Sequence, residues 1–66
     1  MINNVDGLRV TMEQMERLIR ALDDLKKNVL LKNLEIFATM AEAPLDDLDR
    51  LRKEVNGYVH ELKPTT

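Results

Sequence analysis

Apolar residues recur at heptad spacing along the second half of the chain, from residue 34 to residue 62. One position of the heptad is held by Leu34, Ala41, Leu48, Val55 and Leu62, and the other by Phe37, Leu51 and Tyr58, with Pro44 as the single gap. Residues spaced alternately three and four apart share one face of an α-helix. The pattern therefore predicts a helix over residues 33–62 whose apolar face packs against a partner helix.

A second amphipathic segment precedes it at residues 11–30. Its apolar stripe consists of Met15, Leu18, Leu22, Leu25 and Val29, widened by Met12 and Ile19. Thr11 and Gln14 match the T-x-x-Q capping box, in which each side chain bonds the backbone N–H of the other, so we expect this helix to begin at Thr11. Residues 1–10 are then an N-terminal arm, either a short extended piece against the helices or a frayed end, and residues 63–66 are a tail after Lys63-Pro64.

The two helices are separated by a loss of phase between residues 28 and 33. Asn28 is a plausible helix exit and Asn33 a plausible N-cap for the next helix. A connection this short predicts an antiparallel helical hairpin. The alternative is one unbroken helix from Thr11 to Glu42 with a slipped repeat.

Pro44 admits two interpretations. Followed by Asp46 and Asp47, it resembles the first turn of a new helix, where proline and acidic residues are favourable. Inside a helix it removes one hydrogen bond and clashes with the carbonyl of Met40. The heptad keeps its phase through Pro44, which a sharp turn has no reason to do, so we predict one helix kinked near Pro44. Gly57 lies farther along the same helix and is tolerated there.

The chain of 66 residues is long enough for one domain at most. So short a chain buries a small core, and without cysteine it has no disulfide to reinforce it. Leu31, Ile36 and Met40 widen the apolar surface near the connection, which is typical of a helix with two neighbours. We therefore predict a homodimer in which two hairpins form a four-helix bundle. The expected interface residues are Leu31, Ile36, Phe37, Met40, Leu48, Leu51, Val55 and Tyr58.

No set of residues indicates an enzyme, a metal site or a cofactor. The chain has no serine or cysteine nucleophile, and its one histidine, His60, lies off the apolar face. Asp46, Asp47 and Asp49 lack the glycine and the ligand spacing of a calcium loop. Gly57 stands three residues before His60, so the Glu-x-x-His motif of di-iron bundles is absent. A solvated helix surface is the simpler interpretation of these residues.

The net charge of −2 argues against binding that depends on many phosphate contacts. The first residues lack the basic and apolar regions of a signal peptide, and no apolar run approaches the roughly 20 residues of a membrane span. We therefore expect a cytoplasmic protein without a membrane partner.

Two stretches resemble the helical leader of some bacterial antitoxins, residues 8–14 (LRVTMEQ) and residues 51–59 (LRKEVNGYV). In that family a helical hairpin precedes a helix-turn-helix DNA-binding domain. This chain ends at Thr66 without such a domain, so the resemblance implies the pairing or toxin-contacting part and not the repressor.

Two functions follow from these observations. The first is a non-enzymatic interaction or regulatory module, antitoxin-like, that acts on itself and on an unidentified protein partner through helical apolar faces. The second is a nucleic-acid-associated dimer using Arg50, Arg52 and Lys53, with Lys63. Acidic neighbours of these cations cancel much of their field, which disfavours the second function.

Overall fold

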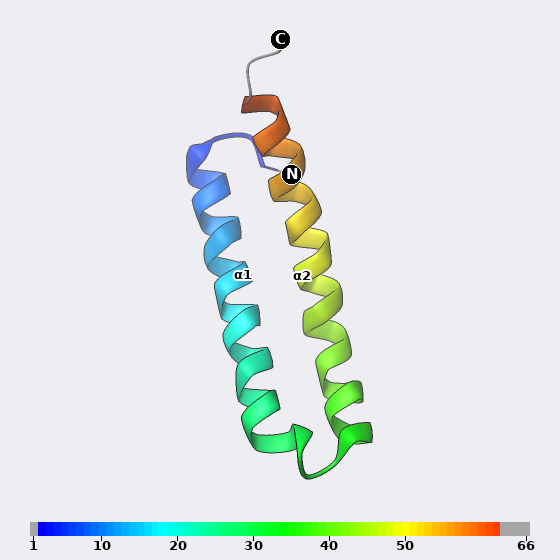
Figure 1. Cartoon of the computed structure of the whole chain (residues 1–66). Helices are drawn as coiled ribbons and strands as arrows, with labels where there is room; N and C mark the ends of the chain where they lie inside the picture. The colour runs from blue at the N-terminus through cyan, green and yellow to red at the C-terminus, as the bar shows by residue number, and fades with distance from the viewer. Residues whose placement is uncertain (1, 63–66) are drawn as a thin grey trace.

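The chain folds into two antiparallel helices that lie side by side (Figure 1). The computed structural model describes residues 2–62 and consists of helix α1 (Val5–Leu25), a π-helical turn η1 (Lys26–Leu30) and helix α2 (Leu34–Leu62). Residues 2–62 contain no strand. The hairpin forms a rod of 50 × 20 × 17 Å. The predicted all-α class and hairpin are therefore confirmed, while the predicted tail at 63–66 lies outside the described residues.

Helix α1 begins at Val5, so the predicted start at Thr11 and the arm over residues 1–10 are wrong. Asn4 is the N-cap: its Oδ1 accepts from the N–H of Gly7 at 2.7 Å. Thr11 is a buried residue within α1, and its hydroxyl donates to the carbonyl of Gly7 at 2.8 Å. Asparagine is as strong an N-cap as threonine, and a threonine inside a helix can bond back to the carbonyl four residues earlier. The helix therefore extends to the earlier cap.

Ile2 precedes α1 and packs on the helices. It is 9% exposed and lies over α2 in a groove that Gly57 and Tyr58 also line. A methyl group at Gly7 would lie 3.6 Å from the Ile2 Cγ2 atom, at ordinary contact distance. The start of the chain thus closes the open end of the hairpin.

The π-helical turn η1 explains the loss of phase seen in the sequence. A π turn contains more residues than an α turn, so it rotates the apolar stripe relative to the preceding helix. Val29 and Leu30 are consequently both half-buried although they are adjacent. The chain then turns sharply, with the N–H groups of Lys32 and Asn33 donating to the carbonyl of Val29 at 3.0 and 2.9 Å. This turn excludes the unbroken helix to Glu42, and Asn28 lies within η1, not at its exit.

Helix α2 agrees with its prediction to within one residue. Asn33 caps it, accepting at Oδ1 from the N–H of Ile36 at 3.0 Å and at its carbonyl from Phe37 at 3.0 Å. The helix continues through Pro44, whose side chain is half-buried. Figure 1 shows the ribbon unbroken there. The absence of a turn at Pro44 confirms the continuous helix, and a kink stays a prediction.

The core is a single layer of side chains between the two helices. Thr11, Ala41 and Leu51 are buried in this layer. No large side chain within residues 2–62 is fully buried, since each helix covers only one side of the other. The half-buried apolar residues of this layer include Leu8, Met15, Leu18, Leu22, Leu25, Val29, Leu30, Phe37, Leu48, Val55 and Tyr58.

The position of the N-cap predicts a larger effect for a substitution at Asn4 than for one at Thr11. We expect Asn4→Ala to lower the free energy of unfolding by about 1 kcal/mol, because the N–H of Gly7 loses its acceptor. Thr11→Val should change it by less than about 0.5 kcal/mol, because valine keeps the shape and the hydroxyl bonds only within the helix. Urea denaturation followed by circular dichroism measures both. The reverse order of effects would place the helix start at Thr11.

Candidate interaction surfaces

The hairpin leaves more large apolar side chains exposed than it buries. Among residues 2–62, only Ile2, Ala41 and Leu51 are buried apolar residues. Against them stand the exposed large apolar residues Val5, Val10, Met12, Ile19, Leu31, Leu34, Ile36, Met40, Leu45 and Leu62. Scattered exposed apolar residues are ordinary on a protein surface, whereas contiguous ones indicate a binding surface. Whether these exposed residues form a binding surface therefore depends on how they are arranged.

One group of them follows the heptad along α1. Val5, Met12 and Ile19 are spaced by seven residues and lie beside the stripe that contacts α2. Ile19 borders a groove of about 400 Å³ together with Leu45 of α2. The apolar surface therefore spans both helices on one side of the hairpin. We call the residues Val5, Met12, Ile19 and Leu45 the Met12 face.

A shallow cleft of about 520 Å³ lies at the first half of α1 within this face. Val5, Leu8 and Met12 form its apolar part. Charged side chains also line it, among them Arg9 and Glu16. Apolar residues flanked by charges are typical of positions where two helices meet.

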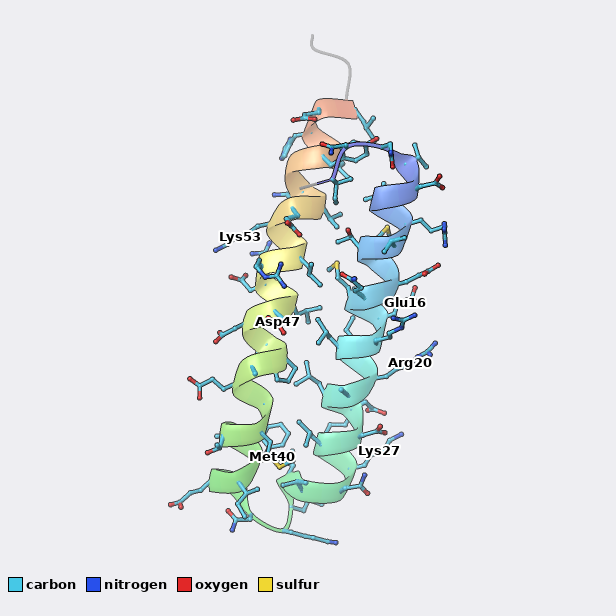
Figure 2. The ribbon with its side chains drawn as sticks, turned by 180° about the vertical axis from the view of Figure 1, so that it is seen from behind. Glu16, Arg20, Lys27, Met40, Asp47 and Lys53 are labelled. Carbon is cyan, nitrogen blue, oxygen red and sulfur yellow. The ribbon has the colours of Figure 1, made fainter. Side chains whose placement is uncertain are left out.

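The other side of the hairpin is more polar. A groove of about 270 Å³ there is lined by Gln14 and Arg17 of α1 and by Asp47 and Arg50 of α2. Met40 precedes Asp47 by seven residues and so lies on the same side of α2, where Figure 2 labels both. Met40 and Met12 are equally exposed, at 50% and 49%, but belong to different sides.

The eight predicted interface residues do not form one surface. Leu31, Ile36 and Met40 are exposed at the turn end, where Leu31 is 94% exposed. Leu51 is 5% exposed because α1 covers it, and its place in the dimer interface stays a prediction. The remaining four are half-buried on the layer between the helices: Phe37, Leu48, Val55 and Tyr58. Sequence reasoning missed Val5 because it predicted an arm there, although the spacing of seven to Met12 and Ile19 was a usable signal.

Ion pairs on the helices are local and exposed. Asp23 accepts from Lys27 Nζ at 2.9 Å and from Lys26 Nζ at 3.3 Å. Hydrogen bonding to these two lysines lowers the pKa of Asp23, and the bond to Asp23 raises the pKa of Lys27. Bonds from Lys53 and Arg52, each at 3.2 Å, lower the pKa of Asp49 in the same way. Figure 2 shows Lys53 and Arg20 pointing outward from opposite edges of the hairpin.

The histidine and carboxylate side chains of the described residues are spread along the two helices. No three histidine or carboxylate side chains within residues 2–62 come together as metal ligands. His60 is exposed in the last turn of α2. No helix within the described range is long and apolar enough to cross a membrane.

Comparison with known proteins adds no relative. No family model, no curated protein and no solved structure matches the chain. The similarity to the antitoxin leader therefore remains a prediction from the residues alone.

The two carboxylates with lowered pKa values predict a pH-dependent stability. A pKa below the unfolded value of 3.8 means that the contribution of Asp23 or Asp49 is present above that pH and is lost as the pH falls through the folded-state pKa. The Asp23→Asn, Asp49→Asn double variant should unfold at lower urea than the parent at pH 7, and the difference should vanish near about pH 2. Glu42→Gln, which changes a carboxylate without an ion pair in the described range, is the control. An equal difference at both pH values would contradict the assignment.

Proposed function

We propose that the protein is a non-enzymatic interaction module that self-associates through the apolar faces of its helices as a homodimeric four-helix bundle. The observation that carries the proposal is the surface area of the hairpin. Its accessible surface is 5372 Å². A compact folded protein of 7.7 kDa exposes about 4,300 Å².

The excess of about 1,000 Å² is similar to the area that one partner contributes to a stable interface, about 800 Å². The radius of gyration supports the same conclusion, because it is 15.0 Å against about 11 Å for a compact domain of this length. A second hairpin packed against the first would give each helix two neighbours, which suits its wide apolar stripe. Self-association thus supplies the core that the hairpin lacks.

We assign the regulatory part of the role to the turn end. Leu31, Ile36 and Met40 offer a compact apolar patch of the kind that a groove on a second protein can accept. An antitoxin-like module would use such a patch on its target. This assignment rests on exposure and on the resemblance of the two sequence stretches.

The alternative, a nucleic-acid-associated dimer, has less support. Arg52 and Lys53 both bond Asp49, and Arg50 lies 3.7 Å from Asp47. These acids neutralise most of the charge that would contact phosphates. DNA retention that falls steeply between two salt concentrations, without a protein partner, would favour this alternative.

The proposal predicts that stability depends on protein concentration. Light scattering should give twice the chain mass at micromolar concentration and above. The melting temperature should rise with concentration, because the folded state gains a binding partner that the unfolded state lacks. A chain that stays monomeric at millimolar concentration, with a constant melting temperature, would refute self-association.

A further inference from the structure

We infer that the second copy docks antiparallel on the Met12 face, with the twofold axis passing beside Met12. The inference rests on the proposed self-association and identifies its contact surface. This surface differs from the residues expected from the sequence, which lie at the turn end and between the helices.

The apolar residues of the Met12 face on α1 are symmetric about Met12. Val5 precedes it by seven residues and Ile19 follows it by seven. In a twofold contact, if residue i touches residue j, then j touches i. An antiparallel copy therefore places Val5 against the partner's Ile19, Ile19 against the partner's Val5, and the two Met12 side chains together. All three exposed side chains are covered at once.

The same twofold rotation also brings side chains of opposite charge together around the cleft. Arg9 and Glu16 both border the cleft at Met12, and they lie three residues before and four residues after it. The twofold axis brings Arg9 of each copy to the partner's Glu16, so that the dimer gains two pairs of opposite charge. Arg9 also pairs with Glu13 of its own helix at 2.7 Å, and the partner's Glu16 would join this pair. Such pairs at the edges of an apolar contact fix orientation.

Helix α2 fits the same axis. Thr11 and Glu54 border one cavity, so the axis beside Met12 crosses α2 close to Glu54. Leu45 lies nine residues before Glu54, and Leu62 lies eight residues after it. The twofold operation thus places the exposed Leu45 near the last turn of α2 in the second copy. One axis therefore covers four of the exposed apolar residues, Val5, Met12, Ile19 and Leu45.

The arrangement leaves the turn end outside the contact. Leu31 and Ile36 lie far along the rod from the axis, and Met40 lies on the opposite side of α2. The dimer would carry two such turn ends, one at each end of the assembly. Self-association and the binding of another protein would therefore use separate surfaces.

Two methionine variants test the contact surface. Met12 and Met40 are equally exposed, so Met12→Glu and Met40→Glu place the same charge at two similarly exposed sites on opposite sides of the hairpin. We expect Met12→Glu to abolish the dimer in sedimentation equilibrium and Met40→Glu to leave it intact. Loss of the dimer only with Met40→Glu would overturn the inference and leave the proposed self-association standing. A parent chain that is monomeric would overturn both.

A charge exchange keeps the test valid if Met12→Glu fails to fold. Arg9→Glu and Glu16→Arg should each weaken the dimer by about tenfold, because each brings like charges together at both symmetric sites. The double variant should recover most of the parent affinity, since the pairs are restored with the signs exchanged. Arg17→Glu, on the other side of α1, is the control and should have no effect. Additive losses in the double variant would overturn the antiparallel pairing.

Discussion

The structure depends on one geometric constraint: two helices can cover only one side of each other. Each helix here has an apolar stripe that is wider than the side covered by the other helix. The side chains between the two helices are therefore half-buried, whereas a larger domain would bury them fully. Thr11, Ala41 and Leu51 mark the few points where the layer closes. The shortage of core and the surplus of exposed apolar residues are therefore two consequences of one arrangement.

The local chemistry of the backbone determines where this arrangement begins and turns. Asn4 and Asn33 cap the two helices, each by accepting the N–H three residues later. The π turn between them allows Val29 and Leu30 both to face the layer before the chain reverses. Pro44 costs α2 one hydrogen bond but not its continuity, because the apolar stripe keeps the same phase on either side of it.

The sequence predicted α2 well because its heptad extends over many turns and because Asn33 stands just before it. It misplaced the start of α1 because Thr11 and Gln14 satisfy the capping rule as well as Asn4 does, and local rules cannot rank caps that lie two turns apart. The sequence predicted that apolar side chains would remain exposed, but it did not predict on which side of the hairpin they would lie. Which side of a helix stays exposed depends on the rotation of one helix against the other, and the π turn changes that rotation.

If an apolar face becomes part of a core only when two chains associate, folding is coupled to association. If the Met12 face is covered only in the dimer, the free energy of folding contains a term that depends on chain concentration. The local ion pairs at Asp23 and Asp49 cannot replace that term, because exposed pairs contribute little. In the proposed dimer the turn end would not share the contact, so its apolar patch would remain exposed at every concentration. The proposed dimer would thus let a chain of this size keep an apolar patch exposed to water, because the contact on the other face would supply the missing stability.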